Sequence, residues 1–170
     1  CEAHMTGRIL VVDDVATIRI VMKVKLAAAY YAVEQADCGL AALDAAHRTA
    51  PALILLDVVM PDMSGLDVCR KLKADPETAE IPIILVTALT DRASKMAGLQ
   101  AGADDFLTKP VDEVTLLARV RSLLRARDTA RELKQRGEPA LGFAEAAAGY
   151  DATEKPGRIA LIASGPKGAV

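Results

Sequence analysis

The sequence lacks the features that would point to a membrane protein, a secreted protein or a nucleic-acid-binding protein. No apolar run approaches the roughly 20 residues that a helix needs to cross a bilayer, and no charged-then-apolar leader opens the chain. Cysteine is scarce: Cys1, Cys38 and Cys69 are odd in number and widely spaced, which suits a reducing compartment. The net charge of -2 gives no reason to expect nucleic acid as a partner. We therefore expect a cytoplasmic protein that binds neither a membrane nor nucleic acid.

The length and composition fit one globular domain with additional residues outside it. Of the 170 residues, 52% are hydrophobic and 26% are charged, which fits a packed domain rather than a disordered tail. We interpret residues 1–4, which precede Met5, as a cloning remnant. The domain is expected at residues 5–127, followed by a helical extension and linker at 128–157. Residues 158–170 are interpreted as the start of a truncated second domain or as a tail.

Apolar strands and amphipathic helices alternate along the expected domain. The strands are expected at residues 8–12, 32–35, 52–56, 83–86 and 105–108. The helices are expected at residues 15–29, 39–49, 66–74, 92–101 and 112–136. Such units predict an α/β fold: a flavodoxin-like, doubly wound, five-stranded parallel sheet in the order 2-1-3-4-5, with an extended C-terminal helix.

Two of these helices carry apolar residues at helical spacing, which we expect to face the core. In the first helix they are Ile18, Val21, Met22 and Leu26. In the last helix they are Val114, Leu117, Val120 and Leu124, with Leu133 as a further candidate. The second half of the last helix is basic, which indicates either a solvated face or a stalk that carries a signal onward.

Polar groups stand where four of the predicted strands end. Asp13 and Asp14 follow the first strand, Asp57 follows the third, and Thr87 and Lys109 follow the last two. The carboxyl ends of parallel strands lie on one edge of a sheet, so these groups should converge there. Three carboxylates select a hard cation, Mg²⁺ or Mn²⁺, and with one lysine they balance the charge for phosphoryl transfer.

Each of these residues also has an ordinary structural interpretation. Asp14 could cap the helix that follows it, Asp57 could be a loop residue, and Lys109 could be a solvated charge. Complementary groups at the ends of four core strands favour the functional interpretation, a metal-dependent phosphoryl-acceptor site.

The sequence resembles the CheY-like receiver domains of two-component response regulators over residues 7–127. The motifs that carry the resemblance are ILVVDD at 9–14, LLDVVMPDMSG at 55–65, VTA at 86–88 and GADDFLTKP at 102–110. The resemblance implies that Asp57 accepts a phosphoryl group from a histidine kinase or a phosphotransfer protein. It implies metal binding by Asp14, Asp57 and the Val59 carbonyl, with Asp13 acting mainly through a bound water.

The resemblance also assigns groups around the acceptor. Thr87, Ala88 and Lys109 would bind the phosphoryl oxygens, and the Lys109–Pro110 peptide bond would be cis. Phe106 stands at the family's switch-aromatic position, and its ring would enter the space that Thr87 vacates when Thr87 turns to the phosphoryl group. Phe106 lacks the hydroxyl that many relatives have, so it can make no outward hydrogen bond. Apolar Val59 and Leu89 would flank the acceptor and shield the acyl phosphate from water.

The chain also looks like the amino-terminal part of a PleD-type diguanylate cyclase, in which a degenerate second receiver follows the first. Residues 157–164 resemble residues 7–14, with Ala163 and Ser164 in place of the acids. The expected function is that of a signalling module, not an enzyme, whose phosphorylation changes packing and dimerisation to control a cyclic-di-GMP-forming output.

Other functions remain open at this point. The chain could be a stand-alone response regulator that acts by binding protein, or an interaction module that is not phosphorylated. A haloacid-dehalogenase-like phosphatase would need a second acid where Val59 stands, and in a flavodoxin Asp13 and Asp14 would repel the phosphate of FMN.

Overall fold

The computed structural model of the protein describes residues 7–137. The chain divides into two compact units, residues 1–127 and 128–170. The fold below is that of the first unit, and the described part of the second is the end of one helix and Gly137. The expected cloning remnant, most of the linker and the expected second domain lie outside the described residues.

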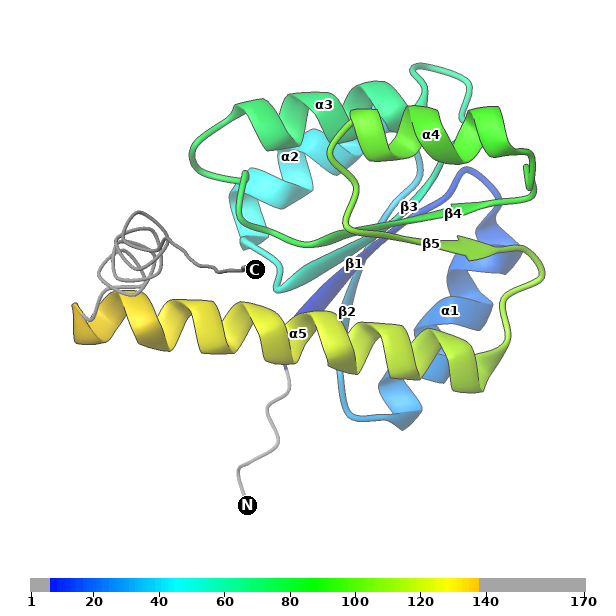
Figure 1. Cartoon of the computed structure of the whole chain (residues 1–170). Helices are drawn as coiled ribbons and strands as arrows, with labels where there is room; N and C mark the ends of the chain where they lie inside the picture. Colours follow the sequence, from blue (N-terminus) through cyan, green and yellow to red (C-terminus); the bar gives the residue numbers. More distant parts are fainter. Residues whose placement is uncertain (1–6, 138–170) are drawn as a thin grey trace, which may run out of the picture. The chain divides into compact units, whose positions relative to one another are not determined.

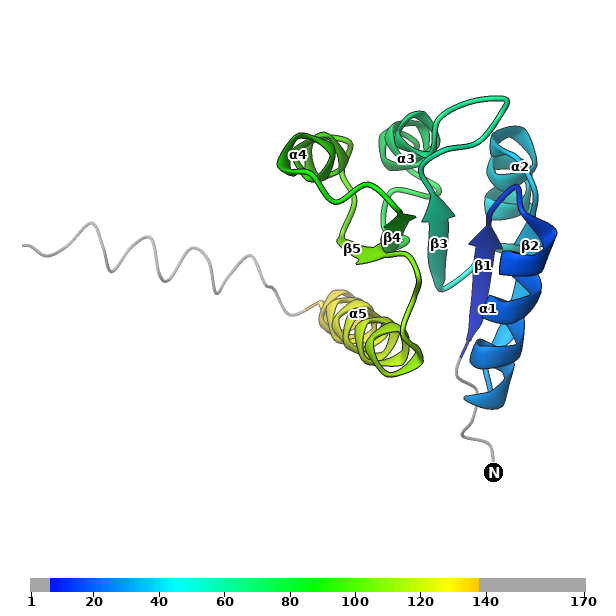
Figure 2. The same cartoon turned by 90° about the vertical axis from the view of Figure 1, so that its right-hand side faces the viewer.

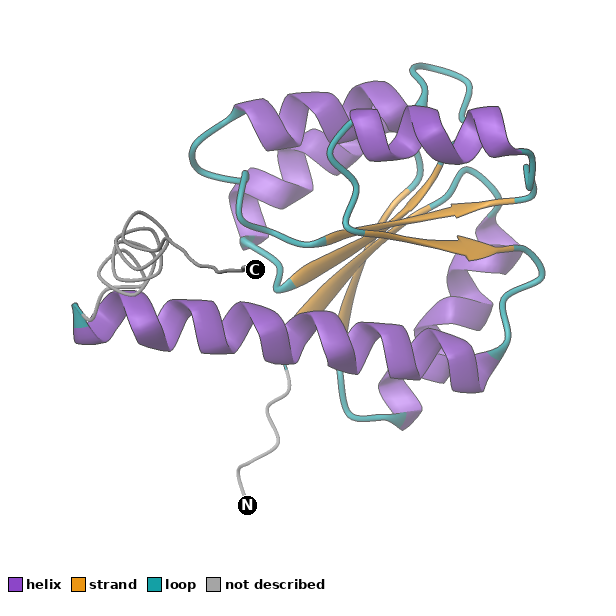
Figure 3. Cartoon of the chain, viewed as in Figure 1, coloured by secondary structure: helices purple, strands orange, loops and turns teal. Residues whose placement is uncertain are grey.

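A parallel sheet of five strands forms the centre of the first unit (Figures 1 and 3). The strands are β1 (Arg8–Val12), β2 (Ala32–Ala36), β3 (Leu53–Asp57), β4 (Ile83–Thr87) and β5 (Asp105–Thr108). They lie in the order β2-β1-β3-β4-β5, and each neighbouring pair is parallel. The predicted doubly wound, flavodoxin-like topology is therefore confirmed.

Helices connect the strands, and each predicted bound lies within one residue of the observed one. The helices are α1 (Ala16–Ala28), α2 (Gly39–Thr49), α3 (Gly65–Ala74), α4 (Arg92–Gln100) and α5 (Glu113–Arg136). The predicted extended C-terminal helix is present, with 24 residues. Among the residues that the structure describes, no helix combines the length and hydrophobicity needed to cross a membrane.

The helices cover both faces of the sheet. Helices α2, α3 and α4 lie on one face, and α1 and α5 lie on the other, as the two views show (Figures 1 and 2). Two apolar clusters fill the two interfaces, and strands β1, β3 and β4 contribute to both. Every residue of β3 and β4 is buried, which explains why strand 52–56 reads as a continuous apolar run rather than an alternating one.

Two of the residues predicted to face the core do not. Val21 in α1 is 44% exposed and Val114 in α5 is 76% exposed. In α5 the buried residues are Leu116, Val120 and Leu124, which are spaced four apart and form one stripe. Both helices carry apolar residues on more than one side, so their spacing alone did not identify the side that packs on the sheet.

Candidate functional site

The register of the sheet brings the predicted site residues to one edge. Asp57 is the last residue of β3 and pairs with Val86, while Thr87 is the last residue of β4 and pairs with Thr108. One residue further, the Lys109 amide donates a hydrogen bond of 2.9 Å to the Thr87 carbonyl. Asp57 and Thr87 therefore end their strands rather than following them, one residue later than predicted.

The three aspartates form a cluster. Asp13, Asp14 and Asp57 each offer a carboxylate oxygen, and these atoms all lie within 4.8 Å of one another. Asp13 and Asp57 are only 3% and 5% exposed, whereas Asp14 is exposed. The alternative that Asp14 caps α1 is wrong, because the N-cap is Val15 and makes no side-chain capping bond.

Asp13 is held in place by its own turn and by α1. Its Oδ1 accepts a hydrogen bond of 2.9 Å from the Val15 amide, and its carbonyl accepts one of 2.6 Å from Arg19. These contacts leave Asp13 Oδ2 directed to Lys109, at 3.0 Å. Arg19 could not be predicted from the sequence, because a basic residue in an amphipathic helix has no distinguishing pattern.

Lys109 joins two of the acids. Its Nζ lies 3.0 Å from Asp13 Oδ2 and 3.0 Å from Asp57 Oδ1. Burial alone would lower the pKa of Lys109, but its bonds to Asp13 and Asp57 outweigh burial and raise the pKa above its usual value. Lys109 is therefore a permanent cation in this site.

The pKa of Asp57 is raised above its usual value. Burial is the largest cause, the hydrogen bond from Lys109 opposes it, and the charge of Asp13 adds to it. A buried carboxylate that shares one lysine with a second acid gains from a further cation. The oxygen-only set formed by Asp13, Asp14 and Asp57 fits a hard divalent ion such as Mg²⁺.

Asp62 anchors the loop from Val58 to Ser64 to helix α2, a role that was not predicted from the sequence. Asp62 accepts hydrogen bonds of 2.9 Å from the amides of Gly39 and Leu40, the first two residues of α2. These bonds lower the pKa of Asp62. The N-cap of α2, Cys38, makes no side-chain capping bond, so Asp62 satisfies that helix end from a distant loop. The one signal in the sequence was the missing capping residue before residue 39.

The same loop packs closely on the end of β3. The Gly65 amide donates to the Val58 carbonyl at 2.8 Å, and a Cβ at Gly65 would collide with the Asp57 carbonyl oxygen. Only glycine permits this approach. Val59, whose carbonyl was predicted as a metal ligand, lies in this loop and is 65% exposed.

Thr87 and Phe106 line the same cavity, and none of the three acids is among its lining residues. The Thr87 hydroxyl accepts a hydrogen bond of 3.0 Å from the Leu89 amide. Thr87, Leu89 and Phe106 contribute to the lining of a cavity of about 210 Å³. Ala88, between Thr87 and Leu89, is exposed, and the Lys109–Pro110 peptide bond is cis.

Comparison with known proteins gives the family. Residues 9–121 match the response regulator receiver domain. The chain is 54% identical over 133 residues to the response regulator PleD of Caulobacter vibrioides. This match covers 78% of the chain and 29% of PleD. It is 43% identical over 121 residues to the transcriptional regulator RpaA of Synechocystis, and this match covers 71% of the chain and 50% of RpaA.

Solved structures agree with this match. A CheY-like response regulator receiver domain protein from Methanospirillum hungatei superimposes with a TM-score of 0.70 at 28% identity. The superposition covers 74% of this chain and 99% of the other. The chain spans half or less of the length of both curated relatives, so the match concerns their receiver part. This chain therefore belongs to the response regulator receiver domain family.

Proposed function

We propose that Asp57 accepts a phosphoryl group from a histidine kinase or a phosphotransfer protein in the cytoplasm. The observation that carries the proposal is the bridging position of Lys109, 3.0 Å from both Asp13 and Asp57 inside a cluster of three acids. A lysine in this place compensates the charge of a phosphoryl group at Asp57. Phosphoryl transfer depends mainly on such compensation and on alignment.

The acids provide the ligands for Mg²⁺, or Mn²⁺. Asp13, Asp14 and Asp57 supply carboxylate oxygens, and the Val59 carbonyl lies in the loop that Asp62 and Gly65 anchor. When bound, the ion compensates the negative charge that otherwise repels the incoming phosphoryl group. Side chains and backbone groups of the chain then bind and orient the phosphoryl group.

In the transfer, an Asp57 oxygen forms a bond to phosphorus as the phosphorus–nitrogen bond of the donor's phosphohistidine breaks, and the imidazole leaves. Lys109 remains protonated throughout and holds the phosphoryl oxygens. Thr87 and the backbone at Ala88 hold them from the β4 side. The burial of Asp13 and Asp57 limits the access of competing water to the acyl phosphate.

The switch follows from the position of Thr87. When its hydroxyl leaves the Leu89 amide for a phosphoryl oxygen, the Phe106 ring enters the cavity of about 210 Å³ that the two residues share. An engineered apolar cavity of about 150 Å³ admits benzene, so this space is large enough for a phenyl ring. The face formed by α4, β5 and α5 then changes its packing.

Mass spectrometry after incubation with acetyl phosphate and Mg²⁺ tests the proposal. The parent chain should gain on the order of 80 Da, and base should remove this mass because it is an acyl phosphate. Asp57→Asn should gain nothing, whereas the matched control Asp44→Asn, an exposed acid on α2, should behave like the parent. Equal labelling of Asp57→Asn would refute the proposal, and continuous release of phosphate would indicate a phosphatase instead.

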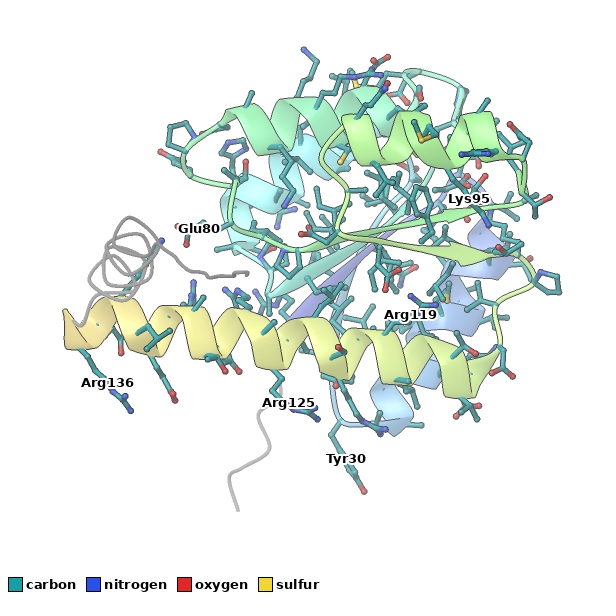
Figure 4. All side chains as sticks on the ribbon, in the orientation of Figure 1. Tyr30, Glu80, Lys95, Arg119, Arg125 and Arg136 are labelled. Atoms are coloured by element: carbon teal, nitrogen blue, oxygen red, sulfur yellow. The ribbon has the colours of Figure 1, made fainter. Side chains whose placement is uncertain are left out.

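For the output, we infer a longer protein that makes cyclic di-GMP and dimerises more strongly when phosphorylated. The 54% identity to PleD and the resemblance to PleD-type cyclases support this output. The basic residues of α5 support a dimerisation surface on this helix. Arg125 points away from the sheet, whereas Arg119 bonds Asp105 of β5 at 2.6 Å (Figure 4). Sedimentation of the chain with and without fluoroberyllate, a phosphoryl analogue, tests dimerisation, and an unchanged mass would refute it.

A further inference from the structure

Gly98, in the second half of α4, is buried against the Phe106 ring of β5. A Cβ at position 98 would collide with Cζ of Phe106 and would stand 2.6 Å from Cε1 of the same ring. It would also stand 2.8 Å from Cδ1 of Leu85 on β4. The ring therefore occupies its observed position only because residue 98 has no side chain.

Phe106 lines two spaces of different character. The inner one is the cavity of about 210 Å³ that it shares with Thr87, whose other walls include the apolar Leu66 and Ala97. The outer one is an open groove of about 380 Å³, whose walls include the charged Lys95 and Arg119 (Figure 4). A ring that is displaced from Gly98 gains more by entering the apolar inner cavity than by entering the charged groove.

We propose that Gly98 is a positioning residue that sets the balance between the two positions of the Phe106 ring. With glycine, the outer position is open and the unphosphorylated arrangement is favoured. Any side chain at residue 98 narrows that position and shifts the ring toward the cavity beside Thr87. This inference rests on the proposed function, because it concerns how phosphorylation at Asp57 is read by the fold.

The consequence for the acceptor site follows from linkage. The ring enters the inner cavity when the Thr87 hydroxyl turns from the Leu89 amide toward the acceptor. A ligand that binds the acceptor with Thr87 in this arrangement must bind more tightly when the ring is already displaced. Gly98 does not line the acceptor site. Of the two side chains that a Cβ at residue 98 would meet, Phe106 lines the cavity beside Thr87 and Leu85 does not, so the effect on the acceptor passes through the Phe106 ring.

The first experiment compares fluoroberyllate binding, with Mg²⁺, in the parent, Gly98→Ala, Phe106→Ala and the double variant by titration calorimetry. Gly98→Ala should tighten binding by on the order of tenfold in the parent, which corresponds to about 1.4 kcal/mol. It should change binding by less than about twofold in the Phe106→Ala background, where no ring is displaced. Gln100→Ala, an exposed change on the same helix, should have no effect in either background.

Urea unfolding provides a measurement that does not depend on phosphoryl chemistry. Alanine in a helix is intrinsically more stable than glycine. Gly98→Ala should therefore raise the urea midpoint more in the Phe106→Ala background than in the parent, where the methyl group meets the ring. Equal shifts of the urea midpoint in the two backgrounds would show that residue 98 does not press on the Phe106 ring and would overturn the inference.

A fluorescent reporter gives a second readout of the position of the aromatic ring. The sequence contains no tryptophan, so Phe106→Trp introduces a single fluorophore at the switch. Fluoroberyllate should shift its emission to shorter wavelength as the indole enters the cavity, and the shift should be smaller when residue 98 is alanine. An emission shift that is independent of residue 98 would overturn the inference.

The outcomes separate this inference from the proposed function. Equal fluoroberyllate affinities in the parent and Gly98→Ala, or the same gain without the ring, would overturn the role of Gly98 and leave phosphorylation at Asp57 intact. Absence of fluoroberyllate binding in the parent would overturn the proposed function and the coupling with it.

Discussion

Replacing Lys109 by methionine should destabilise the metal-free chain and make its stability depend more strongly on Mg²⁺. The lysine ammonium is the cation that bonds both buried acids, at 3.0 Å to Asp13 and 3.0 Å to Asp57. Methionine keeps most of the apolar stem of the side chain, so the substitution removes charge and hydrogen bonds more than packing.

The magnitude follows from burial. Removing one partner of a buried ion pair costs about 3–5 kcal/mol, because the remaining charge stays buried without compensation. Asp13 and Asp57 are at most 5% exposed, but the Lys109 side chain is 21% exposed and solvent already screens part of its charge. We therefore expect a loss near the lower limit, about 3 kcal/mol of the free energy of unfolding.

Urea unfolding in EDTA and in millimolar Mg²⁺ measures both effects. Mg²⁺ at about ten times its dissociation constant adds roughly 1.4 kcal/mol to a protein that binds it only when folded. The gain should be larger in Lys109→Met than in the parent, because the variant has one more uncompensated negative charge. Lys23→Met, an exposed substitution on α1, should stay within about 0.5 kcal/mol of the parent. A loss as small as that of the control, or a deficit insensitive to Mg²⁺, would refute the reasoning.

Three further predictions concern other parts of the domain. A hydrogen bond from His47 to the Leu43 carbonyl and another to Asp75 raise the pKa of His47 above 6.5, so His47 stabilises the fold below that pH and loses this effect as pH rises through the raised pKa. The urea midpoint of His47→Gln should thus differ from that of the parent more at pH 6 than at pH 9. Asp62→Ala should lower the midpoint and weaken Mg²⁺ binding measured by calorimetry, since α2 loses its cap and the loop its anchor; unchanged Mg²⁺ affinity would contradict this. Asparagine at both Val59 and Leu89 should shorten the acyl-phosphate half-life in a decay assay, because water then reaches the acceptor; an unchanged half-life would count against shielding.

The fold could be predicted from the sequence because a parallel sheet covered on both faces requires sequence features that are easy to recognise. Strand 52–56 is apolar throughout because both of its faces are covered, and the crossover rule leaves few topologies for five such units. The convergence of Asp13, Asp57 and Lys109 follows from the same geometry, because the carboxyl ends of the strands share one edge.

What could not be predicted depends on contacts between segments that are distant in sequence. Val114 and Leu116 are both apolar and both lie in the first turn of α5, and only packing against the sheet shows that Leu116 is the buried one. Asp62 caps α2 from 22–23 residues away, so no local pattern reveals it. The closeness of Gly98 to Phe106 likewise depends on how near α4 approaches β5.

The position of each strand in the sheet gives the proposed acceptor and the proposed switch different mechanical surroundings. Asp57 ends β3, which has a hydrogen-bonded strand on both sides, whereas Phe106 belongs to β5, a four-residue strand at the border. Amide hydrogen exchange should accordingly be slowest at β3 and much faster at β5. The proposed phosphorylation would thus take place on a central strand and be sensed on an edge strand, so a partner could change the packing of that edge without disturbing the acceptor.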